Sequence, residues 1–122
     1  MDDADFDDLL DQYLDGTLAP NLEMANVEIV WVDKNPHFGS LHMLREHGVE
    51  KHEVEEVLLE LPPEVEAKRA KDNLRKTYFW GATREGRWLF VACEDRQQGD
   101  TRFLTPITAF EPDDGYEYWR RL

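Results

Sequence analysis

Residues 44–63, LREHGVEKHEVEEVLLELPP, contain a helix end, a second helix and a double proline. Gly48 suits the left-handed residue that follows a helix C-cap, and Val49 can then fold back on Leu44. Pro62 and Pro63 end the second helix, because proline lacks the N–H that a helix interior needs. A chain with this pattern must therefore place two short helices in succession, joined by a tight hinge.

The limits of both helices follow from their flanking residues. The first is expected to begin at Asn35-Pro36, an N-cap followed by proline at the first helical position. Its expected buried positions are Phe38, Leu41 and Leu44. The second is expected to run from about Lys51 to Leu61, because apolar residues recur along one of its faces. These are Val54, Val57, Leu58 and Leu61.

Runs rich in β-branched and aromatic residues predict strands on both sides of the helices. They cover residues 27–32, 76–82, 87–93 and 101–110, with a weak signal around 64–70. The turn TREG makes a hairpin of two of them, and Pro106 indicates an edge strand or a bulge. Residues 114–122 predict a closing helix with Tyr116 and Trp119 on its inner side. We therefore expect an α+β fold of order β-α-α-β-β-β-α, with two helices packed on one face of a mainly antiparallel sheet.

Charge divides the chain into a leader and a body. Residues 1–26 hold eight acidic and no basic side chains, whereas residues 27–122 form a body long enough for one hydrophobic core. In the leader, apolar residues at helical spacing predict a short amphipathic helix, followed by the linker TLAPNLEMAN. The leader is expected either to be a solvated arm that docks loosely, or to cover a basic patch of its own body or a partner's.

The overall net charge of −13 argues against nonspecific binding to nucleic acids. Residues 68–102 nevertheless carry nine basic and five acidic side chains, which leaves a phosphate-facing groove possible. No apolar run has transmembrane length, and the N-terminus is acidic rather than signal-like. The single cysteine, Cys93, is expected to be a buried structural thiol. We therefore expect a cytoplasmic protein that does not engage membranes.

The histidines and the serine give little support to metal or serine chemistry. His37, His42, His47 and His52 are spaced by five residues. On one helix, that step turns each ring by about 140° from the last, so the rings do not share a face. Ser40 lies inside the expected first helix and not in a nucleophile elbow. We therefore expect neither a metal nor a cofactor. His47 itself is either a helix C-cap, where its charge favours the dipole, or a residue with a chemical role.

The body resembles the BrnT family of toxins, which belongs to the RelE/ParE-like superfamily of small ribonuclease toxins. The segments VWVD, LREHGVEKHEVEEVL, YFWGATREGRWLFVACED and RFLTPITAF follow the order of that family over about residues 29–121. The resemblance implies a RelE-like domain and RNA cleavage without a metal, in which a ribose 2′-OH attacks its own phosphate. It also implies the toxin component of a type II toxin–antitoxin pair, with a small DNA-binding antitoxin as partner. A homodimer is possible.

By motif position, the resemblance makes His47 and Arg102 the expected catalytic residues. By composition, the candidates for binding RNA phosphate are Lys34, Arg69, Arg75 and Lys76, and Tyr118 is a looser site candidate. The alternative is a noncatalytic relative that keeps the fold as a protein-binding module. The acidic charge supports it, and so does the last strand, which reads TPITA where the family commonly ends in Ser-Ala-Arg.

Overall fold

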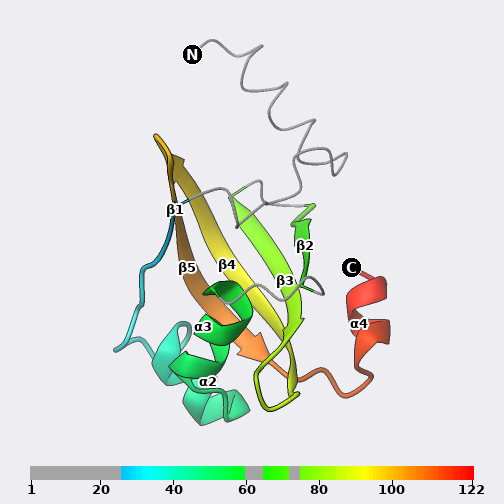
Figure 1. Cartoon of the computed structure of the whole chain (residues 1–122). Coiled ribbons are helices and arrows are strands. Elements are labelled where there is room, and N and C mark those ends of the chain that lie inside the picture. The colour runs from blue at the N-terminus through cyan, green and yellow to red at the C-terminus, as the bar shows by residue number, and fades with distance from the viewer. Residues whose placement is uncertain (1–25, 60–64, 72–74) are drawn as a thin grey trace.

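The computed structural model describes residues 26–59, 65–71 and 75–122, which form an α+β fold with three helices on a five-stranded sheet (Figure 1). The strands are β1 (Asn26–Ile29), β2 (Glu66–Arg69), β3 (Lys76–Ala82), β4 (Trp88–Gln98) and β5 (Thr101–Phe110). The helices are α2 (Ser40–His47), α3 (Lys51–Leu59) and α4 (Tyr116–Arg120). The expected leader helix with its linker, Leu61 and the double proline lie outside the described residues.

The strands are arranged in the order β1-β5-β4-β3-β2. β1 pairs in parallel with β5 and all other pairs are antiparallel, so the sheet is mixed and the mainly antiparallel prediction is confirmed. The expected order lacked one strand, because the weak signal around 64–70 does correspond to a strand, β2. Pro106 pairs with Cys93 beside a register shift, which agrees with the bulge alternative, whereas β5 lies between β1 and β4 and is not an edge strand. β4 extends beyond residue 93, because its charged end continues the hairpin with β5.

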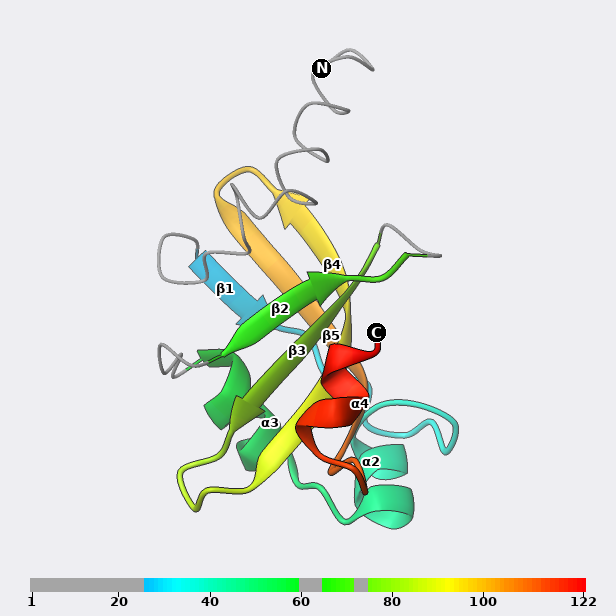
Figure 2. The same cartoon turned by 90° about the vertical axis from the view of Figure 1, so that its right-hand side faces the viewer.

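Each face of the sheet carries its own apolar cluster. The first lies under α2 and α3 and contains Met43, Val49, Val54, Val57, Leu58, Phe79, Leu89, Val91, Cys93, Leu104 and Ala109. The second contains Trp80, Phe90, Ala92 and Trp119, and α4 closes it from the opposite side (Figure 2). Two helices therefore contribute to one face, as predicted, while α4 covers the other. The buried Cys93 agrees with the structural thiol predicted above.

The first helix differs from the prediction at its start and on its buried side. Asn35 accepts a hydrogen bond from the His37 N–H at 2.8 Å, but the helix begins only at Ser40, after Gly39. The reason is tertiary: the Gly39 N–H donates to the Ile107 carbonyl of β5 at 2.8 Å, which holds the preceding residues in a loop. Of the helix residues, Met43 is the buried one. The expected Phe38 and Leu44 are 38% and 52% exposed.

Two further elements, β1 and α4, differ from the prediction. β1 ends at Ile29 rather than at residue 32, although the Val30 N–H still donates to the Leu104 carbonyl at 2.9 Å. In α4, Trp119 is buried as expected, but Tyr116 is 50% exposed and does not lie on an inner side. Tyr116 instead stands beside Trp80, with ring centroids 6.3 Å apart.

Candidate functional site

The hinge between α2 and α3 ends the first helix as the sequence predicts. Gly48 has a φ of 64°, and its N–H donates to the Leu44 carbonyl at 3.1 Å. The Val49 N–H donates to the Met43 carbonyl at 3.1 Å, and the Val49 side chain is buried in the first cluster. This left-handed stop accounts for the His-Gly-Val sequence through helix termination alone.

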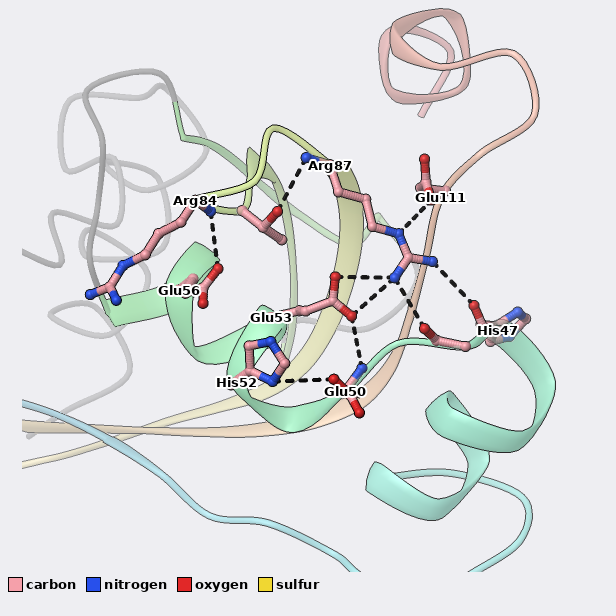
Figure 3. A network of polar contacts seen from close by, with 10 residues as sticks. His47, Glu50, His52, Glu53, Glu56, Arg84, Arg87 and Glu111 are labelled. Atoms are coloured by element: carbon pink, nitrogen blue, oxygen red, sulfur yellow. Dashed lines mark hydrogen bonds and ion pairs between the residues drawn. The ribbon is translucent and has the colours of Figure 1, made fainter.

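Arg87, just before β4, holds this hinge in place (Figure 3). Its Nη1 donates to the Gly48 carbonyl at 3.0 Å and to the two Glu53 carboxylate oxygens at 3.0 and 3.1 Å. Its Nη2 donates to the His47 carbonyl at 3.4 Å, and its Nε donates to Glu111. The bond to Glu111 is the main reason that the pKa of Arg87 is raised, with a smaller contribution from Glu53. The guanidinium therefore joins the hinge, α3 and the end of β5 as a permanent cation.

The His47 side chain is half-buried between rings. Its centroid lies 5.2 Å from that of His42 and 5.3 Å from that of Phe110. Burial lowers the pKa of His47 below its ordinary value of 6.5, and the neighbouring His42 lowers it further. The His42 Nε2 lies 3.3 Å from the Thr108 hydroxyl on β5. At neutral pH the His47 imidazole is therefore mostly uncharged, a state that fits either a packed aromatic ring or a general base.

Arg102 occupies a different environment, on the face of β5 that bears the first cluster. Its side chain is 2% exposed and makes a two-point ion pair with Asp95, with 2.9 Å between Nε and Oδ1. The Thr77 hydroxyl donates to the same carboxylate at 2.7 Å, and the Phe79 ring centroid lies 5.8 Å from the guanidinium carbon. The charge of Arg102 is thus already compensated inside the fold.

The structure does not bring the two expected catalytic side chains together. Arg102 is the second residue of β5, whereas the His47 ring contacts Phe110, the last residue of that strand. Eight residues of strand span roughly 26 Å. The two contacts also lie on opposite faces of the sheet, because Arg102 faces Phe79 of the first cluster and Phe110 packs against the second.

Three of the four expected phosphate-binding residues lie at one end of the sheet. Arg69 ends β2, Arg75 precedes β3 and Lys76 begins it, so all three lie at one end of the β2–β3 pair. Arg102 belongs to the same end of the sheet, because its partner Asp95 donates its N–H to the Arg75 carbonyl at 2.6 Å. We call these four residues the basic end.

The two remaining site candidates lie elsewhere. Lys34 belongs to the loop after β1, where residues 31–37 line an open pocket of about 760 Å³. Tyr118 packs on the α4 face, with its ring centroid 5.3 Å from that of Phe90 and 5.4 Å from that of Phe110. Neither residue contributes to the basic end.

A pocket of about 380 Å³ lies between the β3–β4 turn and α4, and none of its lining residues is among the site candidates named above. Its aromatic walls are Trp80, Trp88 and Tyr116, and Glu111 supplies a carboxylate. Trp88 is 42% exposed, and its ring stacks on that of Trp80 with centroids 5.5 Å apart. Gly86, Pro112 and Gly115 complete the lining. We call this site the aromatic pocket. The spacing of Trp80 and Trp88 across the predicted hairpin was the only signal of it in the sequence.

The comparisons with known proteins do not assign the chain to a family. No protein-family model matches the chain, and no curated protein matches it significantly. The BrnT resemblance therefore stays a prediction. In residues 26–59, 65–71 and 75–122, no group of three or more His, Cys, Asp or Glu side chains could hold a metal ion. None of the described helices has the length and apolarity of a membrane span.

Proposed function

We propose that this chain is a noncatalytic protein-binding module of RelE-like fold that docks a partner segment in the aromatic pocket. The observation that carries the proposal is the pocket itself, in which Trp88 and Tyr116 stay 42% and 50% exposed. Large aromatic side chains left at a concave surface are typical of binding sites, because their burial by a partner contributes much of the affinity. The RelE-like assignment rests on the resemblance described above and on its agreement with an α+β fold.

The surroundings of Arg102 also favour the noncatalytic alternative. A general base and a cationic donor must both reach one phosphate for the 2′-OH reaction to be accelerated. Here the Arg102 guanidinium is buried against Asp95, and the His47 ring contacts the far end of β5. A partner segment at the aromatic pocket needs neither residue.

A peptide-display selection with the full chain tests the proposal. Clones that bind the wild-type protein are counter-selected on Trp88→Leu, which removes one aromatic wall and keeps an apolar side chain. We expect a recurrent peptide family whose binding is lost with Trp88→Leu and retained with Phe38→Leu, a change at an exposed aromatic residue outside the pocket. If the selection yields no family that depends on Trp88, the binding-module proposal is wrong.

The toxin function is a second proposal, supported by the BrnT resemblance and by the basic end. Arg69, Arg75 and Lys76 lie at the same end of the sheet as Arg102, a concentration of positive charge that suits contact with a phosphate backbone. In this alternative the chain cleaves RNA and is neutralised by a DNA-binding antitoxin. Induction of the chain without a partner should then arrest growth, and Arg75→Ala with Lys76→Ala should relieve the arrest. Intact free and ribosome-bound RNA, with no growth effect, would rule this function out.

A further inference from the structure

We infer that the aromatic pocket accepts a cationic side chain, arginine or lysine, from a basic segment of its partner. This inference rests on the proposed function and specifies the partner's chemistry. A cation over the face of a Trp or Tyr ring is attracted by the ring quadrupole, and the attraction strengthens when the site is partly desolvated. The inference depends on the arrangement of the rings, on the charge around them and on how the chain uses the neighbouring tryptophan.

The three rings border the pocket in two orientations. The Trp80 and Trp88 planes are inclined by 25°, whereas the Trp80 and Tyr116 planes are inclined by 57°. Trp80 is only 4% exposed, so an entering side chain would contact the exposed rings of Trp88 and Tyr116. A guanidinium is planar and weakly hydrated, so it suits such stacking better than an ammonium does.

The charged residue that lines the pocket is Glu111, a carboxylate. Residues 84–88 and 111–121, the turn and the closing segment around the pocket, contain five carboxylates and four basic residues, which are Arg84, Arg87, Arg120 and Arg121. The carboxylates are Glu85, Glu111, Asp113, Asp114 and Glu117. Arg120 and Arg121 of the chain end pair with Glu117 and Asp114, and Arg87 pairs with Glu53 and Glu111. The overall chain charge of −13 favours the approach of a basic partner over that of an acidic one.

The chain already places one of its own cations over the ring of Trp119, which adjoins Trp80. The Lys68 Nζ lies 4.7 Å from the Trp119 ring centroid and donates to the Trp119 carbonyl at 2.7 Å. Trp119 in turn stacks on Trp80, with centroids 6.5 Å apart. In the described part of the chain, no Lys or Arg side chain stacks on Trp88 or Tyr116 in the same way. The α4 face therefore holds one aromatic platform filled by its own lysine and a second one open to a partner.

The indole N–H resonances of the full chain in an NMR titration provide the test. The probes are N-acetyl-arginine amide, its uncharged isostere N-acetyl-citrulline amide, and N-acetyl-norleucine amide. We expect arginine amide to shift the Trp80 and Trp88 resonances saturably, with an affinity at least about fivefold above that of citrulline amide. This preference should shrink as salt is added. Trp31, which packs against the first cluster on the opposite face of the sheet from Trp80, serves as the internal reference.

Variants distinguish the binding of a cationic side chain in the pocket from the binding of an apolar one. Tyr116→Ser should weaken arginine-amide binding about threefold or more, whereas Tyr116→Phe, which keeps the ring, should leave it unchanged. Glu111→Gln should reduce binding of arginine amide more than binding of norleucine amide. If citrulline or norleucine amide binds as tightly as arginine amide, the cation inference is wrong. In that case Trp88-dependent display peptides without basic residues would still uphold the binding module.

Discussion

The side chains of Arg102 and His47 differ in how closely the fold encloses them. The guanidinium is almost fully buried in an ion pair, while the imidazole lies half-buried against two other rings. A buried ion pair is hard to break, because each partner left alone must keep its charge away from water. A half-buried imidazole with a lowered pKa instead responds to moderate changes of pH.

Replacing Arg102 by alanine should lower the free energy of unfolding by about 3 to 5 kcal/mol, because Asp95 would remain buried without its cation. Replacing both partners together, Asp95→Leu with Arg102→Met, should cost much less. Arg96→Ala, at an exposed site nearby, should change the free energy by no more than about 0.5 kcal/mol. Urea unfolding measures all three. An Arg102→Ala protein of wild-type stability would contradict the structural role.

Acid should destabilise the protein partly through His47. Its pKa lies below 6.5 in the folded chain, so the unfolded state binds more protons between the folded and unfolded pKa values. The contribution is complete above 6.5 and is lost as pH falls through the folded pKa. His47→Gln should therefore flatten the fall in unfolding free energy between about pH 7.5 and pH 5. An unchanged slope in urea melts of this variant would contradict the assignment.

At the scale of elements, two glycines set the limits of α2 for different reasons. Gly48 has a φ of 64°, and an added Cβ would meet no atom within 4 Å, so its requirement is one of backbone conformation alone. Gly39 has a φ of 93°, and an added Cβ would lie 2.2 Å from the Val32 carbonyl oxygen. The start of the helix thus depends on close packing of backbone, and its end on a left-handed turn.

Substitution of the two glycines should separate these requirements. Gly48→Ala should cost about 1 kcal/mol of unfolding free energy, the usual penalty for a positive φ. Gly39→Ala should cost clearly more, because it adds a clash with a carbonyl that cannot move freely. His47→Ala should cost less than Gly48→Ala. Urea melts that show His47→Ala to be the worse of these two would refute the capping explanation.

The sequence predicts the secondary-structure elements better than it predicts the candidate site. The strands and the hinge could be predicted, because alternating apolar residues and a glycine stop are local signals. The start of α2 could not, since a hydrogen bond from Gly39 to Ile107 outweighs the local N-cap signal of Asn35. The aromatic pocket could not either: Trp80 and Trp88 gain their third wall only when α4 folds over the sheet. The separation of His47 from Arg102 depends likewise on which face and end of β5 each one meets.

At the scale of the whole molecule, the sheet separates two apolar clusters, and Cys93 lies in the first. Its side chain is fully buried, and burial raises the pKa of the thiol far above its ordinary value. A local opening of α4 would not expose it, because α4 covers the opposite face. Access to this thiol therefore reports on the loss of the α2–α3 layer.

A thiol reagent such as Ellman's should accordingly leave the native protein unmodified at pH 8. Modification should begin only in the urea range where the far-UV circular dichroism also falls, because the thiolate is the reactive form and requires solvent. The Tyr116→Ser variant, altered on the other face, should keep this protection. Rapid labelling of the native protein would show that the first cluster opens independently of global unfolding.

The parallel pairing of β1 with β5 has a consequence for how the chain is made. Residues 26–29 are the first described strand to leave the ribosome, yet their partners are residues 101–104. Such a pairing has a high contact order, and it cannot form until nearly the whole body has been synthesised. During translation the apolar side chains of β1 must wait for the β4–β5 hairpin. The interval before that hairpin emerges is when a nascent chain of this topology most needs protection from aggregation.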